Sequence, residues 1–258
     1  MPLSLRPAAA LFGAEIGGID LRAPLTREQR DELQRLLQRY RVLFFRGQQL
    51  STAHQIEFAE AFGPILIFRS VVPADPQHPG VHNVDGSTVG WHLDASGLIE
   101  PPVASVLRAV EIPDRGGDTV WADGMAAYDG MPDDLKSRLE GLSATHTAPN
   151  QHPLVAHPLV SHHPDIGRRY LNINLAPWVD TRILGMSTSH SSALVEQLRA
   201  HHLRSDYQLR FRWSAGAVVL WDNRGMQHTG IRDYGDDTRR RLQRICIAHF
   251  TEGVTGRA

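Results

Sequence analysis

Two segments that lie far apart in the sequence carry the residue types of a mononuclear metal site. The first holds His92 and Asp94, separated by one residue, and the second ends at His228. Two imidazoles and one carboxylate can occupy one face of Fe(II) and leave the opposite positions open for oxygen chemistry. Such a chain must fold so that both segments meet at one centre. The pattern points to a non-haem iron oxygenase.

The composition limits the other classes of function. A chain of 258 residues with 41% hydrophobic content can bury a sizeable core, and we expect a single domain, 1–258. The formal charge of -1 provides no net field for nucleic acid or an anionic membrane. Cys246 is the only cysteine, which excludes an internal disulfide and suits a reducing compartment. No signal peptide or long apolar run is present, so we expect a cytoplasmic protein with a small-molecule substrate.

The first part of the chain predicts two helices and a buried strand. Thr26 and Gln29 have the spacing of a capping box at the start of a helix, and the apolar run 42–45 follows as a strand. Thr52 and Gln55 repeat the capping spacing. The second helix should end at Gly63, because glycine suits the left-handed cap and a proline follows it.

The rest of the chain reads mainly as strands. Helices are expected at 132–142 and 189–203. Short apolar runs between turn residues predict strands at 104–110, 119–122, 170–173, 207–213, 217–221 and 242–250. The expected fold class is mixed α/β, mainly β: a sandwich or barrel with peripheral helices.

The metal motif has to be weighed against chance. In a strand, residues i and i+2 point to the same face about 6.6 Å apart, so His92 and Asp94 can converge on one cation. A second His-x-Asp triplet, at 163–165, lies in a string rich in turn residues, and we interpret it as a solvated loop. The surrounding segment, 149–167, is rich in histidine and proline. We interpret it as a solvated, mobile loop or lid, from which His152 would reach the substrate if the loop folds over the site.

Several longer motifs resemble one family, the taurine/2,4-dichlorophenoxyacetate dioxygenases. This resemblance implies a double-stranded β-helix, or jelly roll, with Fe(II) as the metal and 2-oxoglutarate and O2 as cosubstrates. It further implies that His92, Asp94 and His228 hold the iron and form the catalytic centre. The matching segments are 13–21, 43–48, 62–63, 91–94, 116–119, 121–123, 221–224 and 227–228.

The resemblance also implies how 2-oxoglutarate is bound. Thr119 should hydrogen-bond a carboxylate of the cosubstrate, and an arginine after His228 should receive its distal carboxylate. A guanidinium fits this task because its planar fork matches the two carboxylate oxygens. Three consecutive arginines, 239–241, compete for the role. The family pattern has a second arginine four residues after the first, and Arg240 with Arg244 satisfies it, so we predict Arg240.

The substrate is less constrained than the cofactors. Where taurine-cleaving members have a histidine, a tyrosine and an asparagine around taurine, this chain has Phe68, Val71 and Thr88. Relatives place the position of Arg244 against the anionic end of the substrate, although a buried arginine is also a common structural partner of an acid. We expect Phe68, Val71, Thr88 and Arg244 to bind a substrate that has an anionic end and an apolar body.

Two alternatives remain open from the sequence. The same cofactors can yield desaturation, epoxidation or ring formation instead of hydroxylation, whereas Asp94 disfavours halogenation because a halogenase needs a small residue there. A catalytically silent binding protein on the same fold is a second class. The relatives commonly form dimers or tetramers, so a homo-oligomer is expected.

Overall fold

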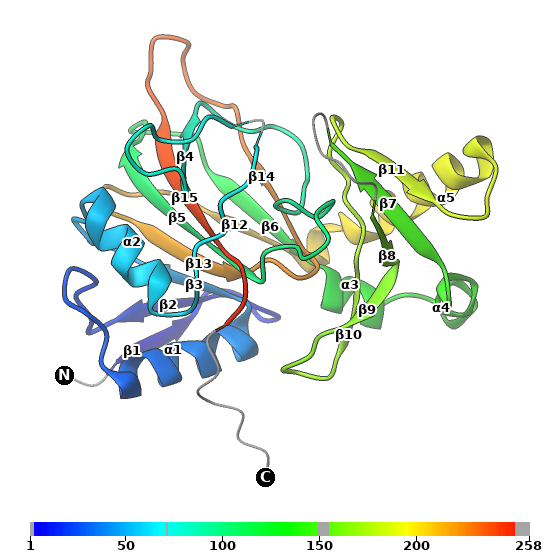
Figure 1. Cartoon of the computed structure of the whole chain (residues 1–258), viewed down its shortest axis with the longest axis horizontal. Helices are drawn as coiled ribbons and strands as arrows, with labels where there is room; N and C mark the ends of the chain where they lie inside the picture. The colour runs from blue at the N-terminus through cyan, green and yellow to red at the C-terminus, as the bar shows by residue number, and fades with distance from the viewer. Residues whose placement is uncertain (1–2, 71, 149–154, 251–258) are drawn as a thin grey trace.

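The computed structural model describes residues 3–70, 72–148 and 155–250, and its centre is a pair of sheets (Figure 1). The smaller of the two has the order β12-β6-β14, formed by β12 (Gln208–Phe211), β6 (Thr119–Asp123) and β14 (Met226–Gly230). The larger sheet has the order β1-β2-β3-β13-β5-β15-β4, formed by β1 (Ser4–Pro7), β2 (Ala14–Gly17), β3 (Val42–Phe45), β13 (Val218–Asp222), β5 (Ala104–Glu111), β15 (Arg241–Ile247) and β4 (Val81–Asp85).

Side-chain alternation along β3 explains how the large sheet is packed on both faces. Phe44 points into the space between the sheets and stacks on Phe211 of β12, with 4.3 Å between ring centroids. Leu43 and Phe45 point the other way, into the core under helices α1 (Arg27–Tyr40) and α2 (Thr52–Glu60). Both faces of the strand are therefore buried, which is why its sequence is an unbroken apolar run.

The two N-terminal helices confirm one capping prediction and correct the other. The Thr26 side chain accepts from the Gln29 backbone N–H, and the Gln29 side chain caps in return. In α2 the capping residue is Ser51, one position earlier than predicted, with His54 as its partner. Gln55 is buried instead and donates to the Gln243 carbonyl of β15, 2.8 Å away. A tertiary hydrogen bond thus decides the register of this helix start.

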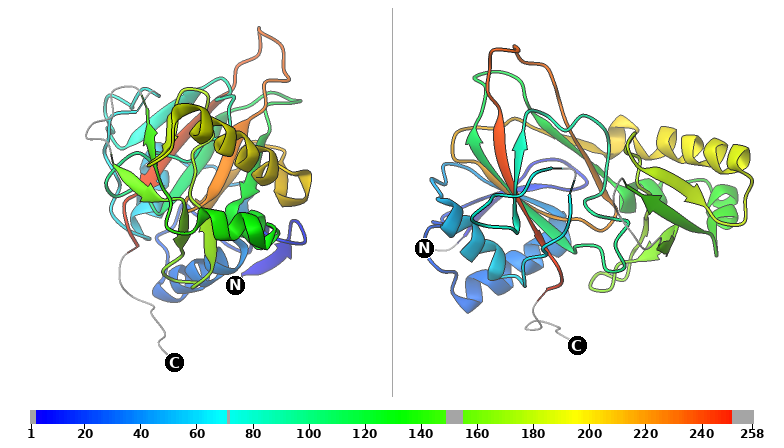
Figure 2. Two further views of the ribbon diagram at one scale, coloured as in Figure 1. Left: turned by 90° about the vertical axis from the view of Figure 1, so that its right-hand side faces the viewer. Right: turned by 45° about the horizontal axis from the view of Figure 1, so that its top comes forward.

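A second group of elements lies to one side of the sheets, on the right in Figure 1 and in the right-hand view of Figure 2. Its own apolar core includes Leu139, Leu171 and Leu198. The group consists of α3 (Gly124–Asp129), α4 (Asp133–Leu139), β7 (Ser143–Thr147), β8 (Ala156–Pro158), β9 (Val160–His162), β10 (Arg169–Leu171), β11 (Asp180–Ile183), α5 (Thr188–His202) and a 3-10 turn at Ser205–Tyr207.

The sequence predicted the main elements and missed several short ones. Each predicted strand contains or overlaps an observed strand, and both later helices form within a few residues of their predicted ends. The strand expected around His92 is wrong: His92 forms a single bridge and a turn follows it. In the segment 149–167, residues 149–154 and hence His152 lie outside the described residues, whereas the remainder includes β8 and β9.

The second His-x-Asp triplet lies in a turn, as predicted, and its Pro164 and Asp165 are exposed, but its histidine is not solvated. The His163 ring is fully buried, and its Nε2 lies 2.6 Å from Asp222 Oδ2 at the end of β13. The same carboxylate pairs with Arg224 Nη2 at 2.7 Å and with Arg41 Nη1 at 3.3 Å. Burial opposes ionisation, but the two arginines and His163 hold the pKa of Asp222 well below its usual range. The turn itself is largely exposed, and within 161–168 only the His163 side chain is buried, against this charged cluster.

This cluster gives a stability prediction. Asp222→Asn should lower the free energy of unfolding at neutral pH by about 3–5 kcal/mol, because Arg41 would stay buried without a counter-charge and Arg224 would keep only Asp165. Since the pKa of Asp222 is lowered by folding, its contribution is present at neutral pH and is lost as the pH falls toward that pKa. Urea unfolding would measure both effects. Asp180→Asn, which removes an exposed pair with Arg182, is the control and should change little; equal effects of the two variants would contradict the prediction.

Candidate active site

A backbone bridge brings the two metal segments together. His92 and His228, which lies on β14, exchange two backbone N–H···O hydrogen bonds, each 3.0 Å long. Their rings lie side by side, with centroids 4.1 Å apart. The Nε2 atoms of His92 and His228 lie 3.9 and 3.8 Å from Asp94 Oδ1. The three ligand atoms thus face one another in a buried site, as the sequence predicted.

The protonation states suit a divalent metal. Burial lowers the pKa of His228 to about 3 and also lowers the pKa of His92, so both imidazoles are neutral near pH 7. The Nδ1 of His92 lies 2.8 Å from the Gly90 carbonyl, and a hydrogen bond there leaves Nε2 free as a ligand. Although burial opposes ionisation of Asp94, Arg244 and the two histidines hold its pKa at about 2. Two neutral imidazoles and a carboxylate fit Fe(II).

Two polar residues that the sequence analysis did not assign fix the position of Asp94. Asn223 accepts from the Asp94 backbone N–H at 3.0 Å and donates to the Asp94 carbonyl at 2.9 Å. Ser105 on β5 donates to Asp94 Oδ2 at 2.9 Å, so that Oδ1 is the oxygen near the histidines. The Ser105 partnership could not be foreseen, because it joins residues on different elements. Asn223 does belong to one of the motifs that carry the family resemblance.

Arg240 is buried and has spare hydrogen-bond donors. Its Nε donates to the Gly117 carbonyl at 2.7 Å, Nη1 to the Gly86 carbonyl at 2.6 Å, and Nη2 to Thr119 Oγ1 at 3.3 Å. A guanidinium has five N–H groups, so one hydrogen on each Nη atom remains. No carboxylate pairs with Arg240 among the described residues, and burial lowers its pKa to about 10. A buried cation with a free two-pronged fork fits a carboxylate ligand.

The competing arginines differ from Arg240 in their surroundings. Arg239 and Arg241 are exposed, and Arg241 pairs with Asp85 at 2.9 Å. Gly117, with a φ of +71°, allows Arg240 to lie against the backbone, because a Cβ there would come within 3.0 Å of Arg240 Cδ. The arrangement favours Arg240 as the arginine that faces a ligand.

A narrow cavity connects Arg240 with the two histidines. One end is cationic, the middle is apolar, and the other end is the metal site, so its chemistry suits a short dicarboxylate bound to the metal at one end. Thr119, predicted to bind 2-oxoglutarate, lies beside Arg240. The lining residues are Val84, Thr88, His92, Leu107, Thr119, Trp221, His228, Gly230, Arg240, Leu242 and Arg244.

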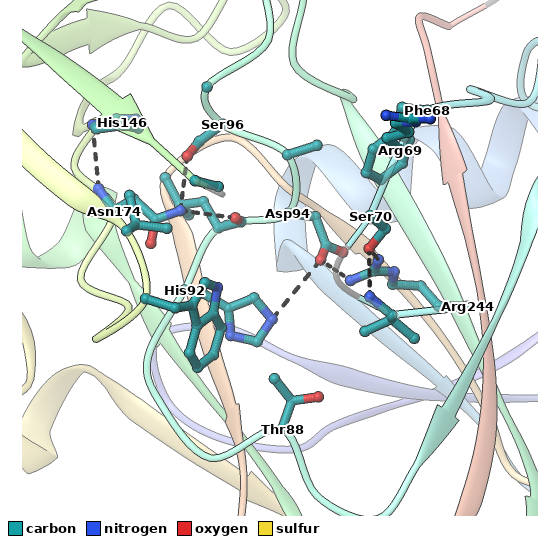
Figure 3. Close-up of a pocket in the computed structure, with 17 residues that line it drawn as sticks. Phe68, Arg69, Ser70, Thr88, His92, Asp94, Ser96, His146, Asn174 and Arg244 are labelled. Atoms are coloured by element: carbon teal, nitrogen blue, oxygen red, sulfur yellow. Dashed lines mark hydrogen bonds and ion pairs between the residues drawn. The ribbon is translucent and has the colours of Figure 1, made fainter. Parts of the chain in front are cut away.

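A second cavity shares Thr88, His92 and Arg244 with the first and is also lined by Asp94 (Figure 3). Three of the predicted substrate residues, Phe68, Thr88 and Arg244, line it. Val71, the fourth, lies outside the described residues. Further lining residues that sequence reasoning did not select are Arg69, Ser70, Val72, Ser96, His146, Asn174 and Trp178. They belong to loops or distant strands, so no local pattern connects them with the metal motif.

Arg244 reaches from β15 to both the metal site and the second cavity. Its Nη1 donates to Asp94 Oδ1, and its Nη2 lies 3.3 Å from Ser70 Oγ (Figure 3). The buried Nε has no hydrogen-bond partner in the described part of the chain. The expectation that a buried arginine has an acidic partner is met by Asp94 itself.

Among the described residues, His92, Asp94 and His228 form the one group of histidine, cysteine and acidic side chains that lie close enough together to hold a metal ion. In the same ranges, no helix has the length and apolar character needed to cross a membrane.

Comparison with known proteins identifies the family of this chain. The model of the family "Taurine catabolism dioxygenase TauD, TfdA family" matches residues 4–246. The chain is 33% identical to an alpha-ketoglutarate-dependent sulfate ester dioxygenase of Pseudomonas putida, over 99% of this chain and 93% of that protein. It is 35% identical to the alpha-ketoglutarate-dependent 2,4-dichlorophenoxyacetate dioxygenase of Cupriavidus pinatubonensis, over 95% and 97%.

A solved structure agrees with these matches. A taurine dioxygenase from Burkholderia xenovorans superposes with a TM-score of 0.88 at 34% identity, covering 96% of this chain and 89% of that one. The predicted jelly roll and oxidoreductase class are confirmed, as is the dependence on Fe(II), 2-oxoglutarate and O2 that is typical of these dioxygenases. The chain belongs to the TauD, TfdA family of dioxygenases.

Proposed function

We propose that this chain hydroxylates a C–H bond of a small organic substrate with an anionic end, in a reaction that converts 2-oxoglutarate and O2 into succinate and CO2. The observation that carries the proposal is Arg240. Its buried guanidinium has two N–H groups without partners among the described residues and lines a cavity that ends at His92 and His228.

Each part of the site has a defined task in this reaction. His92, Asp94 and His228 would hold Fe(II), which when bound supplies the oxygen chemistry. Arg240 and Thr119 would bind the distal carboxylate of 2-oxoglutarate. The apolar side chains between them and the histidines exclude water from the cosubstrate, which strengthens the ionic contact with Arg240.

The second cavity supports the anionic substrate class. Arg244 and Ser70 would hold the anionic end, Arg69 adds positive charge, and Phe68 and Thr88 would form part of the wall. The names of two relatives point the same way, since a sulfate ester and 2,4-dichlorophenoxyacetate are both anions with an oxidisable carbon close to the charge. We therefore favour alkyl sulfates, sulfonates and aryloxyalkanoates as candidates.

The test is to offer these candidates to the Fe(II)-loaded enzyme and to measure 2-oxoglutarate consumption, succinate and the oxidised product together. Hydroxylation predicts one oxygen gained per succinate formed, whereas desaturation or ring formation predicts the loss of two hydrogens, which mass spectrometry separates. If wild type binds Fe(II) and 2-oxoglutarate but none of the candidate classes couples to succinate, the anionic substrate class is wrong. Failure to bind 2-oxoglutarate would favour the silent binding protein.

A variant of Arg244 tests the anion contact. Arg244→Met should raise the KM for an anionic substrate by about 10- to 100-fold, because a buried charged contact is lost. Since Arg244 also donates to Asp94, iron binding must be measured in the same variant. The decisive readout is the ratio of KM values for the anion and its neutral methyl ester. That ratio should approach one in Arg244→Met; an unchanged ratio would mean that Arg244 serves Asp94 alone.

A cytoplasmic location and a homo-oligomer stay predictions from the sequence. Gel filtration with light scattering would test the second.

A further inference from the structure

The Thr119 hydroxyl has an unusual set of neighbours. Its Oγ1 accepts from the Trp213 indole Nε1–H at 3.0 Å and from Arg240 Nη2 at 3.3 Å. A hydroxyl has two acceptor lone pairs and one hydrogen to donate. Both lone pairs are therefore occupied, and the hydrogen must point elsewhere. Among the described residues no group accepts it.

The surroundings of Thr119 indicate where its free hydroxyl hydrogen points. Thr119 lines the cavity between Arg240 and the histidines, and its side chain is 3% exposed. A ligand carboxylate bound to the Arg240 fork would lie next to this hydroxyl. A hydroxyl that donates to a carboxylate forms a charge-assisted bond, about twice as strong as a neutral one.

Strand pairing and ring packing fix the position of Trp213, which does not line the cavity. Strand β12 pairs with β6 so that Phe211 faces Thr119, and Trp213 lies two residues further on. The indole packs edge-on against Phe211, with centroids 5.2 Å apart, and is 6% exposed. Two other buried indoles, Trp121 and Trp221, have no partner for Nε1 in the described part of the chain. The bond from Trp213 to Thr119 is thus not a general feature of this core.

We propose that Trp213 is a positioning residue for the cosubstrate: its indole N–H occupies one lone pair of Thr119 and so directs the Thr119 hydrogen to the distal carboxylate of 2-oxoglutarate. The inference rests on the proposed function of the Arg240 cavity. Without the indole N–H, one lone pair becomes free and the hydroxyl gains orientations in which it does not donate to the carboxylate. Trp213 therefore contributes to selectivity for 2-oxo acids that carry a second carboxylate.

The experiment compares two ligands that differ only at the distal end: 2-oxoglutarate and 2-oxopentanoate, which has a methyl group in place of the distal carboxylate. Both are titrated calorimetrically, without oxygen, into the Fe(II)-loaded enzyme. Trp213→Phe should weaken 2-oxoglutarate binding by about 5-fold, the value of one neutral hydrogen bond, and leave 2-oxopentanoate unchanged. Thr119→Val should weaken 2-oxoglutarate further, and adding Trp213→Phe to it should have no additional effect.

Matched controls separate this role from packing. Trp121→Phe removes the same volume from the same core without removing a hydrogen bond, and it should not change the ratio of the two dissociation constants. Trp213→Met, which also lacks the N–H, replaces Trp213→Phe if the latter does not fold. A Trp213 variant that weakens both ligands equally, leaves both unchanged, or acts additively with Thr119→Val overturns the proposal. If wild type itself does not prefer 2-oxoglutarate, the assignment of the Arg240 cavity has failed instead.

Discussion

Replacing His228 by alanine is expected to weaken Fe(II) binding by more than about 100-fold and to reduce substrate-coupled succinate formation to background. Loss of a residue that merely supports a ligand typically costs 10- to 100-fold in metal affinity, so loss of the ligand itself should cost more. His228 is the cleanest ligand to remove, because its Nδ1 has no hydrogen-bond partner in the described residues. Anaerobic titration with Fe(II) and 2-oxoglutarate, followed by the visible absorption of the chelate, measures the effect.

The control for this variant is His202→Gln. His202 resembles His228 in being buried and in having a pKa that burial lowers, here to about 4. It lies on α5, away from the metal site. The His202→Gln variant should therefore bind Fe(II) as wild type does. An iron affinity of His228→Ala close to that of wild type would mean that the metal is held by other residues.

Arg240→Met is expected to raise the dissociation constant of 2-oxoglutarate by about 100-fold, in line with the 2–5 kcal/mol lost when one partner of a buried charged pair is removed. Arg240→Lys should recover only part of the loss, since an ammonium supplies charge without the two parallel donors of a guanidinium. Iron affinity measured without 2-oxoglutarate should stay at the wild-type value in both variants, which separates this effect from that of His228→Ala.

The neighbouring arginine provides the control. Arg239→Met removes the same side chain one residue away, where it is exposed, and should leave 2-oxoglutarate binding unchanged. If Arg239→Met were the damaging variant and Arg240→Met bound normally, the assignment within the arginine run would be wrong.

Local chemistry in the sequence was sufficient for much of this structure. The capping box at Thr26 depends on only two residues three positions apart. The buried strand 42–45 can be recognised from its unbroken apolar run. The metal residues were predictable because iron demands particular side chains, and such residues can be recognised before their positions are known. The spacing of four residues between Arg240 and Arg244 selected Arg240 from the arginine run, and both side chains are buried.

Other features depend on contacts between distant elements, and no local pattern encodes them. The start of α2 moved by one residue because Gln55 bonds to β15. The sequence neighbours of His163 predict a solvated side chain, but its ring is buried because it hydrogen-bonds to Asp222 at the end of β13. Ser105 supports Asp94 only after β5 and the loop that follows His92 have come together. Hydrogen-bond partners of this kind require the tertiary structure.

The backbone bridge between His92 and His228 has a consequence for how the enzyme is assembled and maintained. Because two main-chain hydrogen bonds set the spacing of these two histidines, we expect the chain to fold and to form the metal site before any ion binds. Chelators should therefore strip the enzyme without unfolding it, and fresh Fe(II) should restore it.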